Sequence, residues 1–521
     1  MRSILHRHKE RFAAALLAVL LAPGMLPVGA AENLSTPIVI DGKAPPASVD
    51  PDSVHAINKT LAMDKLRLNN SLKDDSFKTI RLEVQYDQQI SLEEALNYAI
   101  QNNLAIKISK ESLKYQQFVL YGQVANMLPN LTVAYNLTHT DIMNEKVGSN
   151  AKVFLTRLAY PVFQGGSVVY GILGQYYREK GWEQAYKANI SDALLDLYTR
   201  YNNLLLARVL LQIRAKAVEV SQEQVRVNTI KEAAGTGARF NILQSEAQLA
   251  TDRQALLQQQ VAVRQAALAL NFSMNFPMGV NLVPVEETIT EQSLFQNQSS
   301  IDSLVGVALK RRPELREYEL FKIAAARNIQ VASAPLYPQV SLFQQYSYTN
   351  TVTTAPPAST TTSTGTDTSG AGVFGGLFRT YQQGLGIVWS LNNMGVTAVS
   401  NIAASNSLSH QASVQANQEL QTVLQQVRSD YLNWRAAREQ IDNAAHGVTA
   451  SAEELRLAAI RLDQGVGTNL DVITAQHDYV NALTTQAQAI VGSNMAQAQL
   501  LHDTGIISSD TLLHGFKGDI N

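Results

Sequence analysis

The sequence contains no cysteine among its 521 residues. Disulfide bonds, thiolate metal ligands and a lipid-modified cysteine at a mature N-terminus are therefore all excluded. Charged residues make up only 17% of the chain, and 42 basic residues against 44 acidic residues give a formal charge of -2. Because this balance provides no bulk attraction to a polyanion, we expect no nucleic-acid partner.

Long hydrophobic runs are also scarce. The apolar run 12–22 is about half of the ~20 residues that a membrane-spanning helix needs, and it follows the basic residues Arg2, Arg7, Lys9 and Arg11. Small residues come next at positions 29–31. This order predicts a secretory signal peptide over residues 1–31. Because no later segment is long enough to cross a bilayer as a helix, membrane attachment would have to come from strands.

Motifs for catalysis and cofactor binding are missing as well. None of the nine histidines has the spacing of a metal-binding motif such as His-Glu-x-x-His, and no phosphate-binding Gly-x-x-x-x-Gly-Lys loop is present. The pairs His477-Asp478 and His502-Asp503 lie in helical patterns, where we expect solvated faces. We therefore predict that the chain is no enzyme and has no catalytic residues, no cofactor and no metal site.

What the sequence does contain is an internal repeat. Ser91 and Ser300 each open a helical pattern, and each pattern ends near a proline, Pro129 and Pro338. Both pairs are separated by the same number of residues, 300 − 91 = 209 and 338 − 129 = 209. Further along, two glycine-rich tetrapeptides are 465 − 235 = 230 residues apart, and a coiled-coil seam with steps of four and three precedes each of them in register.

Each half is predicted to form a helix, a strand, a loop, a second strand, a very long helix, a tight turn and a returning helix. The proline-free stretch 167–234 would extend ~100 Å as an α-helix, although its early glycines predict irregular first turns. We expect a mainly α fold with a small β part and long antiparallel coiled-coil helices. The predicted divisions are a signal peptide (1–31), an N-terminal periplasmic arm (32–89), a first repeat (90–271), an equatorial linker (272–299), a second repeat (300–505) and a C-terminal tail (506–521).

Four segments alternate large apolar residues with small or polar ones, as two-faced strands do. They lie near 131–138, 154–162, 340–348 and 381–389, and each has about the length that a tilted transmembrane strand needs. The opposite faces carry polar residues such as Arg157 and Gln382. The face predicted to meet lipid consists of Leu131, Val133, Tyr135, Phe154, Leu158, Tyr160, Val340, Leu342, Tyr381, Leu385, Ile387 and Trp389.

Four membrane strands leave edges that hydrocarbon does not tolerate, so several chains must close one barrel. Eight strands from two chains would enclose an interior filled by side chains, whereas twelve strands from three chains leave room for a lumen. The Thr-rich and Gly-rich segment 350–376 between the second pair of strands is expected to be a solvated loop outside the cell.

The layout after the arm resembles the TolC-like outer-membrane efflux protein family. The matching motifs are Ser91-Leu92-Glu93-Glu94-Ala95-Leu96, the run from Ala308 to Leu315, Pro129 and Pro338, the run from Tyr160 to Gly166, and the run from Gly465 to Val472. The resemblance implies a homotrimer with a 12-stranded transmembrane β-barrel and a periplasmic α-barrel. It also implies two partners, a periplasmic adaptor (membrane fusion protein) and an inner-membrane transporter. The expected function is a passive outer-membrane channel for efflux or type I secretion.

The resemblance also assigns roles to the two turns. Their residues, expected to dock the adaptor, are Gly235, Thr236, Gly237, Ala238, Gly465, Val466, Gly467 and Thr468. A structural explanation exists beside this one, because helix C-termini often need a glycine. Asp471 is expected in a periplasmic gate, where three copies would form a cation-attracting ring. Its competing role is to stabilise the start of a helix through the helix dipole.

One alternative from another class remains at this point. A secreted coiled-coil structural or adhesive protein would use the same seams, but it would not need four lipid-facing strands. Dependence on detergent separates the two, because a protein that folds and is monodisperse in plain buffer has no lipid-facing barrel.

Overall fold

The computed structural model describes residues 86–142, 147–295, 300–354 and 373–516. The chain divides into two compact units, Met1–Thr79 and Ile80–Asn521, and every described residue belongs to the second unit. The predicted signal peptide, nearly all of the N-terminal arm and most of the Thr-rich loop lie outside the described residues. Those expectations therefore stay predictions.

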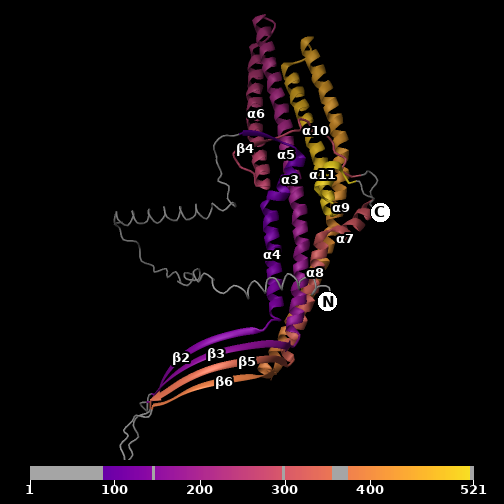
Figure 1. The fold of residues 1–521 in the computed structure, drawn as a ribbon. Coiled ribbons are helices and arrows are strands. Elements are labelled where there is room, and N and C mark those ends of the chain that lie inside the picture. The colour runs from indigo at the N-terminus through magenta and orange to yellow at the C-terminus, as the bar shows by residue number, and fades with distance from the viewer. Residues whose placement is uncertain (1–85, 143–146, 296–299, 355–372, 517–521) are drawn as a thin grey trace, which may run out of the picture. The chain divides into compact units, whose positions relative to one another are not determined.

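Four antiparallel strands form one sheet at one end of the second unit (Figure 1). Its order along the sheet is β2 (Asn130–Ile142), β3 (Val147–Gln164), β5 (Gln339–Thr354) and β6 (Val373–Val388). All four predicted strands are thus confirmed, and each is longer than its alternating pattern indicated. Each repeat contributes one β-hairpin, and β2 and β6 are the two edges of the sheet.

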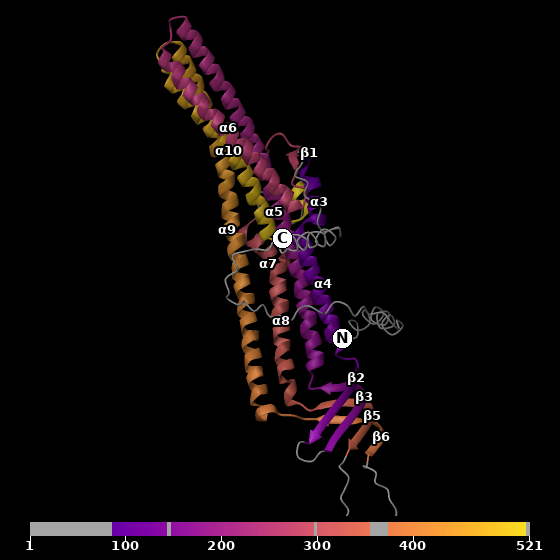
Figure 2. The same ribbon diagram turned by 90° about the vertical axis from the view of Figure 1, so that its left-hand side faces the viewer.

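Two very long helices carry the chain away from the sheet. The helix α5 (Ser167–Ala233) has 67 residues and α9 (Val396–Asp463) has 68, and each returns after a tight turn as α6 (Arg239–Met274) or α10 (Asn469–Asp503). In Figure 2 the two turns lie together at the end opposite the strands. Between these ends α5 packs on α6, α10 and two shorter helices of the sheet side. Among the described residues, no helix combines the length and the apolar character required to cross a membrane.

The helical pattern that opens each repeat is broken into two helices, not one. The first repeat has α3 (Leu92–Asn102) and α4 (Leu104–Ala125), and the second has α7 (Ile301–Arg311) and α8 (Pro313–Ser333). The breaks fall at Asn103 and Arg312, which are again 312 − 103 = 209 residues apart. Asn103 ends α3 and caps α4 by accepting from the backbone of Ala105 at 2.8 Å. In the second repeat Pro313 occupies the first turn of α8, a position that proline favours.

The prediction of irregular first turns in α5 is wrong, because the helix is continuous from Ser167. Its early glycines serve close helix packing instead. A Cβ atom at Gly181 would lie only 2.4 Å from the ring of Phe321 on α8. The side chain that is absent at this position therefore lets α5 and α8 approach one another.

The main core lies around the level of the helix breaks. There β1 (Tyr86–Ile90) pairs in parallel with β4 (Val280–Pro284), and Tyr201 of α5 donates to the carbonyl oxygen of Ile90 at 3.2 Å. The C-terminal segment adds α11 (Ser509–His514), whose Leu512 is fully buried. Large buried side chains from several helices complete this core, including Leu96, Leu197, Tyr198, Leu204, Leu270, Met274, Leu304, Leu500 and Leu501.

Candidate functional site

The strand register places the residues predicted to meet lipid on one common face of the sheet. Directly opposite residues share a face, and the pairs include Leu131 with Leu158, Tyr135 with Phe154, Tyr160 with Leu342, Leu342 with Leu385, and Val340 with Ile387. Tyr381 follows by two-residue alternation, and Trp389 lies one residue beyond β6. Most of these side chains are exposed in the chain, which is unusual for so many large apolar groups in one patch.

The other face of the sheet is mainly polar. One row across all four strands consists of Thr132, Arg157, Gln345 and Gln382. The guanidinium of Arg157 lies 5.5 Å from the centre of the Phe343 ring, so this aromatic residue also has a cation partner on that face. Opposite Phe343 is Gly384, which provides room for the ring. The sheet therefore has one apolar face and one face suited to water.

The two turns at the far end have the same backbone geometry. Gly235 and Gly465 adopt left-handed φ values of 74° and 73°, a conformation that glycine adopts without strain. The N–H group of Thr236 donates to the carbonyl oxygen of Lys231 at 2.9 Å, and that of Val466 donates to Arg461 at 3.0 Å. These bonds define a Schellman motif at each helix end.

The second glycine of each turn fits closely against the helix that precedes it. A Cβ atom at Gly237 would lie 2.9 Å from backbone atoms of Lys231 and Glu232. At Gly467 the corresponding distance to the backbone of Arg461 is 3.0 Å. Helix termination thus accounts for all four glycines, while the large side chain between the second pair, Val466, is 68% exposed.

Asp471 has a complete local explanation at the start of α10. Its carboxylate accepts from the backbone N–H of Thr468 at 2.9 Å, and the Thr468 hydroxyl accepts from the backbone N–H of Asp471 at 3.2 Å. This reciprocal pair is a capping box. The hydrogen bonds from Thr468 lower the pKa of Asp471 below its usual range, and nearby Arg461 adds to the effect. The side chain is otherwise open to solvent.

Close to the turns, buried polar side chains join the two helical hairpins. The amide of Asn228 on α5 donates to Ser245 of α6 at 2.8 Å and to Asn469 of α10 at 2.9 Å. Gln224 donates to the same oxygen of Asn469 at 2.9 Å, and Asn469 in turn donates to Gln244 at 2.8 Å. The second hairpin therefore inserts a polar side chain into the first. The sequence analysis missed this network because its members are more than 200 residues apart.

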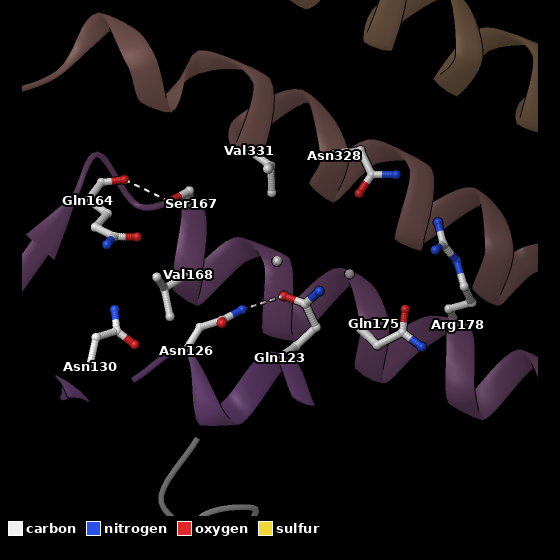
Figure 3. A pocket seen from close by; sticks show the side chains of 12 residues that line it. Gln123, Asn126, Asn130, Gln164, Ser167, Val168, Gln175, Arg178, Asn328 and Val331 are labelled. Atoms are coloured by element: carbon white, nitrogen blue, oxygen red, sulfur yellow. Dashed lines mark hydrogen bonds between the residues drawn. The ribbon is translucent and has the colours of Figure 1, made fainter. Parts of the chain in front are cut away.

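A polar cavity of about 350 Å³ lies where the helices meet the sheet (Figure 3). Amide side chains dominate its lining, namely Gln123, Asn126, Asn130, Gln164, Gln175 and Asn328. Among its described lining residues only Arg178 can ionise. The hydroxyl of Ser167 donates to the backbone of Gln164 at 2.9 Å, with no base beside it. This lining is suited to solvation and contains no pair of groups for acid–base or nucleophilic chemistry.

The expectation for His502-Asp503 is wrong, because the pair is buried and not a solvated face. Asp503 is 2% exposed, and its carboxylate contacts Nδ1 of His502 at 2.7 Å. The guanidinium of Arg312 lies 3.6 Å from the same carboxylate and 3.2 Å from that of Glu314. By contrast His477-Asp478 is exposed, as expected. Sequence spacing could not distinguish the two pairs, because the partners of His502 come from distant helices.

Asp192 of α5 completes this cluster, with its Oδ1 atom 2.8 Å from Nε2 of His502. Burial alone would lower the pKa of His502, but its hydrogen bonds to Asp192 and Asp503 prevail and raise the pKa to about 9. Burial also raises the pKa of Asp430 on α9, and the adjacent Asp503 raises it further. The cluster therefore connects α5, α8, α9 and α10 through charge.

Comparison with known proteins now identifies the group to which this architecture belongs. The outer membrane efflux protein family matches residues 95–275 and 304–502, well over half of the chain. The chain belongs to this family. Each matched segment covers most of one repeat, and the gap between them contains the connection through β4. The family consists of outer-membrane channels and not of enzymes, so the resemblance seen in the sequence is confirmed.

Individual relatives agree with this membership. The outer membrane efflux protein BepC of Brucella suis biovar 1 (strain 1330) is 22% identical over 422 residues, which cover 80% of this chain and 86% of BepC. The solved structure of CusC has a TM-score of 0.67 at 15% identity and covers 83% of this chain and 95% of that chain. The open state of the Neisseria gonorrhoeae MtrE channel gives 0.62 at 17% identity, covering 83% and 94%. At these identities the structural likeness concerns the fold.

Proposed function

We propose that this chain is the outer-membrane channel of a tripartite efflux or type I secretion system. It passively conducts substrates that an inner-membrane transporter delivers through a periplasmic adaptor. The sheet is the observation that carries the proposal, because it has one apolar face and two unpaired edges in a member of the outer membrane efflux family. The strands lie in the outer membrane, and the helices extend through the periplasm.

The two edges support closure by several chains. Within the described part of the chain, β2 and β6 are hydrogen-bonded on one side only. An unpaired backbone group in hydrocarbon costs several kcal/mol, so an open sheet cannot span a bilayer. Pairing of β2 with β6 of the next chain would close the sheet, and a homotrimer would have twelve strands around a lumen. The apolar face then meets lipid, and the row of Arg157, Gln345 and Gln382 lines the water-filled interior.

Disulfide cross-linking tests this closure directly, because the natural chain has no cysteine. Thr132→Cys on β2 is combined in turn with Thr380→Cys, Gln382→Cys or Gly384→Cys on β6, since the register between chains is unknown. We expect at least one pair to give a covalent trimer on a non-reducing gel, while Thr132→Cys alone gives at most a dimer. Failure of every pair to exceed the dimer would contradict the trimeric barrel. A protein that is folded and monodisperse without detergent would instead support the secreted coiled-coil protein.

We further propose that the two turns dock the adaptor. The support is their position at the end farthest from the sheet and the exposed apolar side chain of Val466 between two glycines. Val466→Trp should leave folding and assembly intact but abolish efflux, because a bulky side chain prevents close approach. Val466→Leu is the matched control and should retain efflux. Unchanged drug susceptibility of cells that carry Val466→Trp would refute the docking role.

The proposed gate at Asp471 rests on the same assembly. In a trimer three copies of Asp471 would gather near one axis and attract cations. The capping box holds each carboxylate in a fixed position and keeps it ionised, which is compatible with both the capping role and the gating role.

A further inference from the structure

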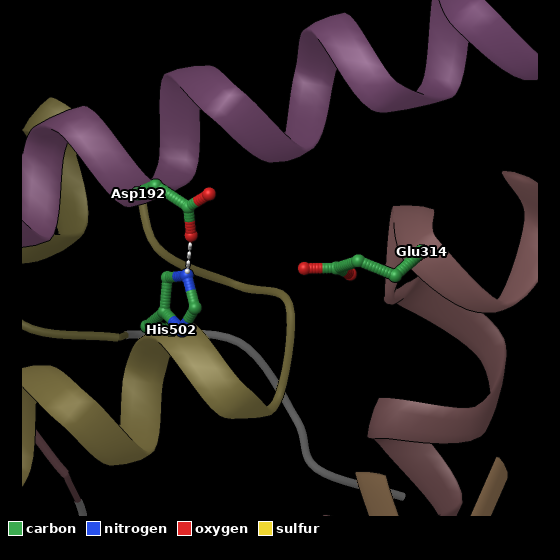
Figure 4. Close-up of side chains that lie close together, drawn as sticks. All are labelled: Asp192, Glu314 and His502. Atoms are coloured by element: carbon green, nitrogen blue, oxygen red, sulfur yellow. Dashed lines mark hydrogen bonds and ion pairs between the residues drawn. The ribbon is translucent and has the colours of Figure 1, made fainter. Parts of the chain in front are cut away.

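Three side chains that can bind metal converge from three different helices near the level of the helix breaks. Figure 4 shows Asp192 on α5, His502 on α10 and Glu314 on α8, with the carboxylate of Glu314 directed toward the other two. One possible ligand atom from each residue lies within 4.8 Å of the others. Positions 192 and 502 belong to different repeats, so only the folded chain brings the three together.

The imidazole is held as metal-binding histidines are held. Its Nδ1 atom is 2.7 Å from the carboxylate of Asp503, which is itself buried, so Nε2 is directed toward Asp192. Histidines that bind metals usually donate their other ring N–H to a carboxylate, which fixes the ring and makes the ligand nitrogen more basic. The buried Asp503 therefore has the position of a supporting residue.

Charge and access also fit a cation. The carboxylates of Asp192, Glu314 and Asp503 outnumber the one neighbouring permanent cation, Arg312. Arg312 contacts Oε2 of Glu314, and a carboxylate has a second oxygen with which to bind a metal. The side chain of Asp192 is 61% exposed whereas that of His502 is 8% exposed, so the group has a buried floor and an open side through which an ion can enter.

We propose that Asp192, Glu314 and His502 bind a divalent transition-metal ion of the Zn²⁺ type, with Asp503 as the residue that orients the histidine. One imidazole nitrogen and two carboxylate oxygens suit Zn²⁺, whereas Mg²⁺ and Ca²⁺ prefer oxygen ligands alone. Water completes the coordination on the open side. The ion replaces a proton on Nε2, so one proton is released on binding if His502 starts in its charged form.

Only small movements are required. Zinc bonds of about 2.0–2.2 Å in a tetrahedron place ligand atoms about 3.3–3.5 Å apart. The Nε2 atom of His502 and Oδ1 of Asp192, now 2.8 Å apart, would separate slightly to admit the ion. Glu314 would approach by rotation of its flexible side chain. The bound ion would cross-link the first repeat, through α5, to the second, through α8 and α10, at the core of the molecule.

Calorimetric titration of Zn²⁺ into the full-length mature protein tests the site. The protein is purified in detergent with a tag that contains no histidine, and EDTA is used and then removed. We expect one ion per chain, and binding at least tenfold weaker in Asp192→Asn and in Glu314→Gln. Matched controls are Asp196→Asn, one turn away on α5, and His477→Gln, in an exposed pair on α10. Both controls should bind Zn²⁺ as the wild type does.

Three results would overturn the proposal. The first is the lack of one bound ion per chain, and the second is equal affinity in Asp192→Asn and Asp196→Asn. The third is displacement of Zn²⁺ by a hundredfold excess of Mg²⁺, which would show that the imidazole is not a ligand. Because the titration measures neither efflux nor trimer formation, its failure leaves the proposed channel function untouched.

Discussion

The two repeats have the same backbone plan but differ in how they fill it. Both have a broken first helix, a β-hairpin, a very long helix and a Schellman turn at constant offsets. Near the turn, however, the first hairpin contains the buried polar residues Asn228 and Ser245. At the equivalent positions of the second, 230 residues later, Ala458 and Ala475 pack with Val472. The duplicated pattern therefore specifies the backbone, while contacts between the repeats require different side chains.

The strand hairpins are where the repeats should behave most alike, and where a single change should have the largest effect. A lysine at the bilayer midplane costs ~2–4 kcal/mol per site, and a trimer would contain three copies. We expect Leu158→Lys in the first repeat and Leu385→Lys in the second to abolish outer-membrane assembly equally. Gln382→Lys, on the opposite face of β6, should assemble normally. The amount of trimer in purified outer membranes measures all three.

If Leu158→Lys and Leu385→Lys assemble at the wild-type level, then the apolar face does not meet lipid. If only one of them assembles, the two hairpins lie in different environments, and the symmetry between the repeats ends at the sheet.

The helix breaks should differ in strength. Arg312 is 5% exposed, donates to Gln426 at 2.6 Å and faces the carboxylates of Glu314 and Asp503. Arg312→Met leaves buried negative charge without its partner, which typically costs about 3–5 kcal/mol. Asn103→Ala removes a helix cap worth about 0.5–2 kcal/mol, together with the amide donor to Ser273. Thermal unfolding in detergent should therefore show the larger decrease for Arg312→Met. Equal decreases would mean that the ionic cluster adds nothing.

The hairpin interiors allow the two repeats to be exchanged. Asn228→Ala leaves the hydroxyl of Ser245 and the amide of Asn469 without a donor, a cost of about 1–3 kcal/mol. Ala458→Asn should cost at least as much, because it buries an amide among apolar side chains. The double variant Asn228→Ala/Ser245→Ala imitates the second repeat and should lose less stability than the sum of its single changes. Strict additivity in this double-mutant cycle would exclude a shared network.

The sequence predicted the features that depend on local pattern. Alternation around Leu131 and Leu385 predicted the strands, and the constant offsets predicted two matching halves. It failed where distant residues decide the outcome. Gly181 was interpreted through helix propensity, but Phe321 of another helix determines its role. His502-Asp503 was placed in solvent because its partners, Asp192 and Arg312, are far away along the chain.

The break at Arg312 had a local signal that the helical pattern concealed. Pro313 could have indicated a new helix, since proline favours the first turn and disfavours a helical residue before it. The break at Asn103 had only the weaker signal of an asparagine, a residue that favours caps. No comparable signal exists for the network around Asn469, whose donors come from α5.

The smallest expected effect concerns the start of the returning helices. At this turn the second repeat has a capping box formed by Thr468 and Asp471, whereas the first has Ala238 without a side-chain cap and Asn241 in place of the aspartate. The pKa of Asp471 is lowered in the folded chain, so its contribution is present above the unfolded value of 3.8 and is lost as the pH falls through the lowered value. Asp471→Asn should therefore decrease thermal stability slightly at pH 7, and the difference should vanish in acid. Ala238→Thr/Asn241→Asp should install the missing capping box in the first repeat and raise stability slightly.

These stability changes test only the capping role, so conductance must test the gate. In planar bilayers, multivalent cations added from the periplasmic side should block the wild-type channel if three Asp471 side chains form a ring. Asp471→Asn should then lose the block, whereas Thr468→Ala, which removes a cap worth about 1 kcal/mol but keeps the carboxylate, should retain it. Identical block in the wild type and Asp471→Asn would leave Asp471 as a capping residue. Loss of block in Asp471→Asn alone would show that the same carboxylate both starts a helix and restricts the channel, which is one further way in which the second repeat differs from the first.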